Sequence, residues 1–153
     1  MKQIALVFLA AAAAAVLAAP APSVNPIQVV QARHRQFRAM GAAMKGLTDQ
    51  LKSNPPSMIK IVQYAGALDA LGPHVGEWFP LGTGPEDNVA THAKAGVWKN
   101  PDLFRRDAQA LAASTHNLAQ MAKAGSAPAI RAAAVRVGHA CQTCHTAFRE
   151  PED

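Results

Sequence analysis

The clearest chemical signal in the sequence is a cysteine and histidine pattern near the carboxyl end. Cys141 and Cys144 are separated by two residues, and His145 follows directly. On one helical turn, two thiols at this spacing can add to the two vinyl groups of a single porphyrin, and the next histidine can ligate its iron. The pattern therefore predicts one covalently attached haem c with His145 as the metal ligand.

Other uses of a cysteine pair fit this sequence less well. A thioredoxin-like dithiol opens a helix after a strand, where the helix N-terminus lowers the thiol pKa, but this pair lies late in a predicted helix. A disulfide between residues three apart would constrain almost nothing. Zinc would need two further ligands, and the remaining histidines show no ligand spacing: His34, His74, His92, His116 and His139.

The place of the motif in the chain raises a second question, namely what faces the other side of the iron. Only eight residues follow His145. The familiar small cytochromes c carry the motif near their start and take a methionine ligand from far downstream. Here the facing residue must come from an element earlier in the chain.

Four helices are predicted from proline-marked boundaries and an alanine-rich composition. The sequence has 34 alanines but only eight aromatic residues among 153, which favours helices over a β-sandwich. The predicted boundaries are Asn25-Pro26 and Asn54-Pro55-Pro56 for the first helix, Met58 and Gly72 for the second, Asn100-Pro101 and Gly125 for the third, and Ser126 and Glu150-Pro151 for the fourth.

Turn residues dominate between Gly72 and Lys99, so we expect a long connection there that packs against the helices. The predicted fold is all-α: an antiparallel four-helix bundle with this long connection between helices 2 and 3. Because alanines bury little area each, a large apolar guest would add to the stability of such a core.

The amino-terminal segment has the pattern of a secretory signal peptide. Lys2 precedes an apolar run from Ile4 to Leu17, which is too short to cross a bilayer comfortably. We expect cleavage after Ala18, so that residues 1–18 are removed and 19–153 form a single haem-binding domain in the periplasm. The net charge of +5 then concerns solubility or an acidic partner, since an exported protein is expected to bind neither nucleic acid nor, after cleavage, a membrane.

Four segments in order carry a resemblance to a known family. They are Arg33 to Lys45, Phe79-Pro80-Leu81-Gly82-Thr83, Val97 to Phe104, and Cys141 to Arg149. Together they resemble cytochrome c′, the high-spin member of the class II cytochromes c, over essentially all of the mature sequence. The haem motif alone is common to many cytochromes, and it is the conjunction of the four segments that is specific.

The resemblance implies a role for each matching residue. Cys141 and Cys144 would hold the haem, and His145 would be the proximal ligand. Phe37 would lie over the distal face, with Arg33 near the haem edge and propionates, and Arg149 would cover the solvent side of the proximal imidazole.

Two of these placements also have support from the residues themselves. Arg33 interrupts an apolar seam, where a cation is costly unless it is paired, although a snorkelling arginine is the alternative. Arg149 lies four residues after His145 and so on the same helix face, although a cation at a helix C-terminus is favourable in itself. Met40 and Phe79 are expected in the core or against the haem.

Phe37 decides between two functions. In the low-spin relatives of the cytochrome c-556 type a methionine at its position ligates the iron, whereas phenylalanine has no lone pair to donate. We therefore expect five-coordinate, high-spin iron that binds a small gas, and the resemblance implies nitric oxide. The alternative is a low-spin electron carrier with an unknown redox partner, in which a shifted helix brings Met40 to the iron.

Two further expectations concern catalysis and assembly. A peroxidase-like activity lacks support, because no distal histidine and arginine pair at catalytic spacing is evident, so the protein is not expected to be an enzyme. The resemblance implies a homodimer through the first two helices, and apolar residues expected to be exposed there are compatible with it: Ile27, Val29, Ile59 and Tyr64.

Overall fold

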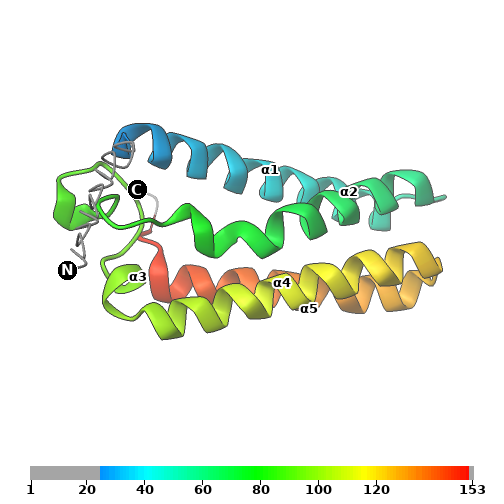
Figure 1. Cartoon of the computed structure of the whole chain (residues 1–153). Coiled ribbons are helices and arrows are strands. Elements are labelled where there is room, and N and C mark those ends of the chain that lie inside the picture. The colour runs from blue at the N-terminus through cyan, green and yellow to red at the C-terminus, as the bar shows by residue number, and fades with distance from the viewer. Residues whose placement is uncertain (1–24, 152–153) are drawn as a thin grey trace, which may run out of the picture.

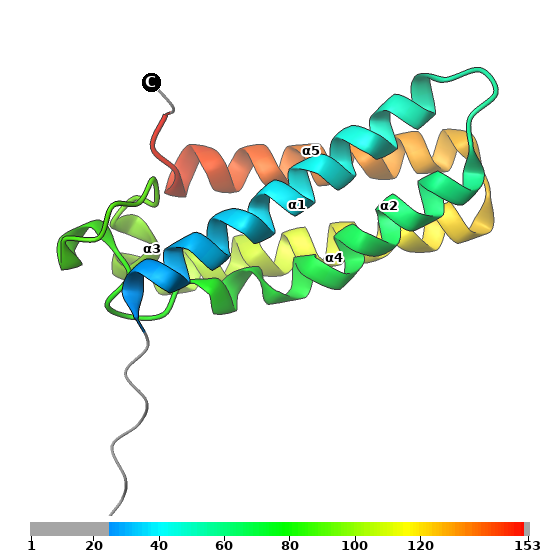
Figure 2. The same cartoon turned by 90° about the horizontal axis from the view of Figure 1, so that it is seen from above.

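The computed structural model describes residues 25–151, and four long helices dominate it. They are α1 (Pro26–Lys52), α2 (Met58–Leu71), α4 (Pro101–Ala124) and α5 (Ala127–Phe148). Figures 1 and 2 show that they run along one another, with each helix antiparallel to the next in the chain. The predicted antiparallel four-helix bundle is confirmed. The predicted signal peptide lies outside the described residues.

Some of the helix boundaries show local capping hydrogen bonds and others do not. The Asn25 side chain accepts hydrogen bonds from the backbone N–H of Ile27 at 3.0 Å and of Gln28 at 3.4 Å, as an N-cap does. Gly125 ends α4 with a φ of 75°, a left-handed conformation in which glycine carries no steric cost. The Asn100 side chain makes no capping hydrogen bond, so Pro101 alone marks that boundary.

The long connection between α2 and α4 is more regular than the sequence analysis predicted. It contains two 3-10 turns, Gly72–Trp78 and Pro85–Asp87, and a short helix, α3 (Gly96–Lys99). Proline occupies one of the first two positions of each 3-10 turn. Its fixed φ favours a tight turn there, and its lack of an N–H costs no hydrogen bond at a first position. Figure 1 shows the connection at the same end of the bundle as the start of α1 and the end of α5.

The core is built from aliphatic side chains that are almost completely buried. The largest of them are Leu47, Ile61, Leu68, Leu118, Ile130, Val75 and Val137. Small residues let backbones approach between them: a Cβ added to Gly72 would lie 2.4 Å from Thr115 Oγ1, and one added to Gly46 would lie 2.5 Å from the Tyr64 ring. Each long helix therefore turns an apolar stripe towards the interior.

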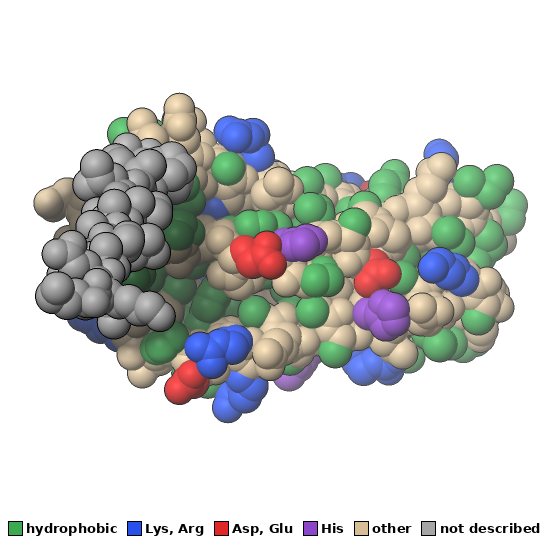
Figure 3. Space-filling view, viewed as in Figure 1, with side chains coloured by type: hydrophobic (Ala, Val, Ile, Leu, Met, Phe, Trp, Pro, Cys, Tyr) green, Lys and Arg blue, Asp and Glu red, His purple; other side chains and the backbone are tan. Residues whose placement is uncertain are grey.

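The helices pack unequally. α5 packs closely against α4, and α1 against α2, whereas α1 and α5 touch each other much less. None of the helices in residues 25–151 is both long and apolar enough to cross a bilayer. On the face shown in Figure 3, basic, acidic and histidine side chains occur singly or in small groups among apolar ones. Between α1 and α5 there is instead a cavity, and its charged lining residues are basic.

Candidate functional site

A cavity of about 730 Å³ opens between α1 and α5. Its volume lies within the range of ordinary ligand and cofactor sites. Residues of α1, α5 and the connection line most of it, and all eight residues predicted for the site are among them: Arg33, Phe37, Met40, Phe79, Cys141, Cys144, His145 and Arg149. The structure thus brings the two ends of the chain, more than a hundred residues apart, around one space.

The two thiols lie on the cavity side of α5. Cys141 and Cys144 are both free and half-buried, and their spacing of three residues places them on adjacent positions of one helix face. Burial raises the pKa of both thiols, and for Cys144 burial together with the nearby charges of Asp107 and Cys141 raises the pKa to about 11. Thiols of this kind stay protonated at neutral pH, unlike those of a dithiol oxidoreductase.

His145 lies in the last turn of α5 and lines the same cavity. The helix ends three residues later, at Phe148, and Arg149 adopts extended backbone (φ −120°, ψ 133°). Arg149 is therefore the C-cap of α5, the first residue beyond the last helical turn. Arg149 nevertheless lines the cavity, and its backbone N–H still donates to the His145 carbonyl at 3.0 Å.

The long connection holds the end of α5 through backbone pairing. Ala93 and Arg149 form an antiparallel bridge, flanked by hydrogen bonds from the Lys94 N–H to the Phe148 carbonyl (2.9 Å) and from the Glu150 N–H to the His92 carbonyl (2.8 Å). This pairing gives the physical reason why the helix stops at Phe148. It also fixes the backbone immediately after His145.

Arg33 is buried in α1, with 2% of its surface exposed. Its guanidinium donates to the Trp78 carbonyl at 3.4 Å and to the Thr83 side chain and carbonyl at 3.4 and 3.3 Å. It also donates to the Thr91 hydroxyl at 2.8 Å and lies 4.3 Å from the centre of the Phe79 ring. Arg33 is thus not a snorkelling side chain, because it ties the connection to α1 while it lines the cavity.

Phe37 faces the cavity from one turn beyond Arg33. It is half-buried and held edge-on against Trp78, with the ring centres 5.0 Å apart. Met40 also lines the cavity, but only 6% of it is exposed and it packs within the main core. The aromatic ring therefore presents more accessible surface to the cavity than the Met40 thioether does.

Basic groups line the cavity, and no carboxylate of residues 25–151 does. The basic side chains are Arg33, Arg38, Lys45 and Arg149, together with the imidazoles of His34, His92 and His145. Burial lowers the pKa of Arg33 to about 10, so its guanidinium keeps its charge at neutral pH. Burial, followed by the charges of Arg33, His92, Arg38 and Arg149, lowers the pKa of His34.

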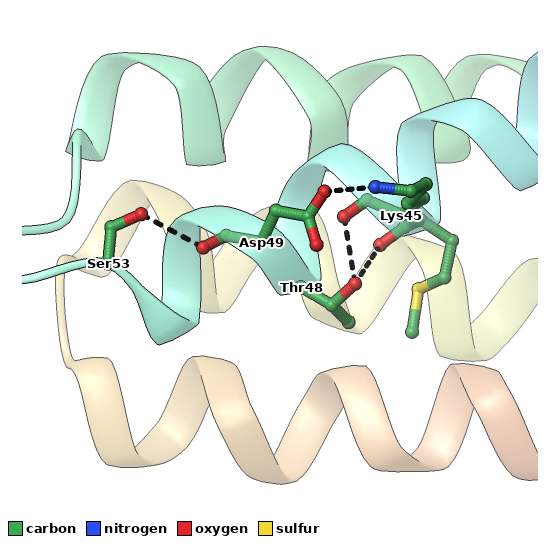
Figure 4. A network of polar contacts seen from close by, with 5 residues as sticks. Lys45, Thr48, Asp49 and Ser53 are labelled. Atoms are coloured by element: carbon green, nitrogen blue, oxygen red, sulfur yellow. Dashed lines mark hydrogen bonds and ion pairs between the residues drawn. The ribbon is translucent and has the colours of Figure 1, made fainter.

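Of the basic groups that line the cavity from α1, Lys45 lies furthest along the helix. Figure 4 shows its ammonium paired with Asp49, one turn further along the helix, while Thr48 donates to the carbonyls of Met44 and Lys45. The hydrogen bond between them, aided by their opposite charges, raises the pKa of Lys45, and the same hydrogen bond is the main reason that the pKa of Asp49 is lowered. Because both side chains are exposed, this pair adds little stability.

The residues around the cavity fit a haem. Two adjacent thiols and a histidine are the attachment and ligand groups of a haem c. The phenylalanine and methionine side chains across the cavity offer the apolar surface that a porphyrin ring needs. The basic lining, without a carboxylate, suits the two anionic propionates of such a group.

Sequence reasoning missed several residues of this site. His34 and His92 line the cavity with ring centres 6.2 Å apart. Their spacing in the sequence did not predict that they lie together. Thr91 and Thr83 were missed as partners of Arg33 because they lie 58 and 50 residues away in an irregular segment. The turn residues around them, and for Thr83 the resemblance of the Phe79 to Thr83 segment, were the available signals.

Comparison with known proteins places these observations in a family. The family described as Cytochrome C′ matches residues 28–149. The cytochrome c′ of Pararhodospirillum photometricum is 33% identical over 126 residues, which cover 82% of this chain and 99% of the relative.

Solved structures agree. A cytochrome c′ with a ligand-controlled dimer dissociation superposes with a TM-score of 0.78 at 23% identity, covering 84% of this chain and 99% of the other. A nitric oxide complex of a cytochrome c′ variant from Alcaligenes xylosoxidans gives a TM-score of 0.74 at 25% identity, covering 82% and 97%. By sequence and by fold, this chain belongs to the cytochrome c′ family.

Proposed function

We propose that this protein is a periplasmic haem c protein with an open iron position that binds small diatomic gases, nitric oxide foremost. The supporting observation is that one cavity is lined by Cys141, Cys144 and His145 on one side and by Phe37 on the other. Cys141 and Cys144 would attach the haem covalently, and His145 would be its proximal ligand. Ferrous haem iron with one vacant axial position binds such gases.

Phe37 supports this function because its side chain cannot ligate the iron. Its ring has no lone pair for a metal, and held against Trp78 it supplies an apolar surface that excludes water. A distal side of this kind gives no hydrogen bond to bound oxygen, while nitric oxide depends less on one. The cytochrome c′ variant from Alcaligenes xylosoxidans with a similar fold was solved with nitric oxide bound.

The function is tested on the ferrous holoprotein by absorption spectroscopy with and without nitric oxide. We expect a high-spin spectrum that changes on addition of stoichiometric nitric oxide. A spectrum of six-coordinate, sulfur-ligated iron before any gas is added would reject the proposal and identify the low-spin electron carrier, with Met40 as the ligand.

The Phe37→Met variant tests the position of this side chain. Because a thioether can ligate iron, we expect this variant to become low-spin and to bind nitric oxide far more slowly, while the matched Phe37→Leu variant stays high-spin. If Phe37→Met remained high-spin, Phe37 would not lie over the iron.

We further propose a homodimer through α1 and α2. Ile27 and Ile59 are 62% and 74% exposed on these helices, and one structural relative is a cytochrome c′ whose dimer dissociates under ligand control. Val29 and Tyr64 were also expected to be exposed, but both are only partly exposed. The Tyr64 ring packs over Gly46.

Sedimentation over a dilution series checks the dimer. We expect Ile59→Glu to dissociate at a higher concentration than the unmodified protein. The matched variant Val135→Glu changes an equally exposed apolar residue on α5 (72%) and should leave the dimer intact. Equal behaviour of the two variants would contradict an interface at α1 and α2.

A further inference from the structure

Asp107 on α4 is the buried carboxylate of residues 25–151, with 8% of its surface exposed. Its Oδ1 accepts hydrogen bonds from Arg106 Nε at 3.2 Å and Nη2 at 3.1 Å. The Arg106 side chain itself is 71% exposed. An ionised carboxylate inside a protein is costly unless it is paired, and the gas-binding function described above makes no use of this one.

The packing of α4 on α5 places Asp107 next to the haem attachment site. The Phe104 and Phe148 rings meet edge to face with their centres 5.2 Å apart, and further along the same helix pair Arg136 Nη2 donates to Asn117 Oδ1 at 2.7 Å. These two contacts fix an antiparallel register between the helices, which lie side by side in Figures 1 and 2.

In this register Asp107 faces Cys144. Asp107 lies three residues after Phe104 on the same face of α4, and Cys144 lies four residues before Phe148 on the same face of α5. Cys144 also packs against the cluster that contains Phe104 and Phe148, which places it beside this part of α4. Arg106 is the ion-pair partner of the Asp107 carboxylate, at 3.1 Å.

We propose that Asp107 lowers the reduction potential of the haem by holding a fixed negative charge beside the Cys144 attachment, and that Arg106 moderates this effect from the surface. The inference rests on the proposed function, because it requires a haem attached at Cys144. Reduction brings one electron from an external donor into the site, and a nearby negative charge in a poorly solvated interior disfavours that added charge. The exposed Arg106 is screened by water and offsets the carboxylate only in part.

Spectroelectrochemical titration of the holoprotein tests this role through the signs of three shifts. Asp107→Asn should raise the midpoint potential, Arg106→Gln should lower it, and Asp107→Glu should stay near the unmodified value. Asp102→Asn is the matched control on the same helix, since Asp102 also pairs with an arginine (Arg105, 2.8 Å) but is 91% exposed, and it should leave the potential unchanged.

The outcomes separate this role from the proposed function. If Asp107→Asn carries attached haem with an unshifted or lowered potential, or if Asp102→Asn shifts it equally, the role of Asp107 is wrong while the haem site stands. If Asp107→Asn does not fold, Arg106→Gln decides, and an unchanged or raised potential there overturns the role. Unmodified protein without attached haem would overturn the proposed function and this inference together.

Discussion

The two sides of α5 differ in how completely they are packed. Towards α4 the helix is closed, with Ile130 and Ala133 fully buried and the Phe104 and Phe148 rings in contact. Towards α1 it borders a cavity of about 730 Å³, where Cys141 and Cys144 are only half-buried. A helix that is packed to completion on one side and left open on the other is built to receive a guest on the open side.

Residue types differ between the two sides in the same way. Small and branched aliphatic side chains fill the α4 side, where close packing of helices provides the stability. Sulfur, aromatic and basic side chains border the α1 side, and these are the groups that attach, cover and neutralise a haem. The two sides meet at Cys144 and Phe148, which line the cavity and also pack towards α4.

The largest effect is expected from damage to the closed side. Leu118 on α4 is completely buried, so Leu118→Ala should lower the free energy of unfolding by roughly 2–5 kcal/mol, through lost burial and the cavity left behind. Denaturant unfolding of the purified protein measures this.

The matched change on the open side is Met44→Ala, which shortens a half-buried side chain of the cavity lining. We expect it to cost less than half as much in free energy of unfolding, because the half-buried Met44 gives up less buried surface than the fully buried Leu118. Equal losses in the two variants would contradict the difference between the sides.

An intermediate effect is expected at Arg33, which links α1 to the connection. Arg33→Met keeps an unbranched apolar stem but removes the guanidinium and its hydrogen bonds to Trp78, Thr83 and Thr91. Leaving such buried acceptors without a donor should cost roughly 1–3 kcal/mol. Hydrogen exchange should show the loss of protection concentrated in residues 78–95, and uniform exchange across all helices would count against Arg33 as the anchor.

The smallest effect is a pH dependence of stability from His34. Its pKa is lowered in the folded protein from the ordinary value of 6.5, so the unfolded chain binds the proton more readily. The contribution of His34 is therefore complete above pH 6.5 and is lost as the pH falls towards the folded pKa. His34→Gln should flatten the fall in unfolding midpoint between pH 7.5 and 5. An unchanged slope would assign the acid sensitivity to other groups.

Much of the fold followed from the sequence because its signals are local. Pro26, Pro101 and Gly125 mark helix ends by their own backbone chemistry, and the three-residue spacing of Cys141 and Cys144 is already one turn of helix. The contacts of Arg33 were not predictable, since its partners lie in a segment without periodicity. Arg149 was assigned to a helix that ends one residue earlier, because pairing with Ala93 takes over there.

Asp107 shows a different limit of sequence reasoning. After two arginines on a helix it has the pattern of an exposed acidic residue, and only the register of α4 against α5 turns it inward. Local charge patterns do not reveal which face of a helix a neighbour will cover.

Mass spectrometry shows directly whether the open side of α5 carries a covalently attached haem. The chain, including its amino-terminal segment, is produced in a bacterial host that attaches haem to exported cytochromes, purified and cleaved after arginine. We expect the peptide from Val137 to Arg149 to carry the added mass of one haem through Cys141 and Cys144. The same peptide with two free thiols and no added mass would contradict it.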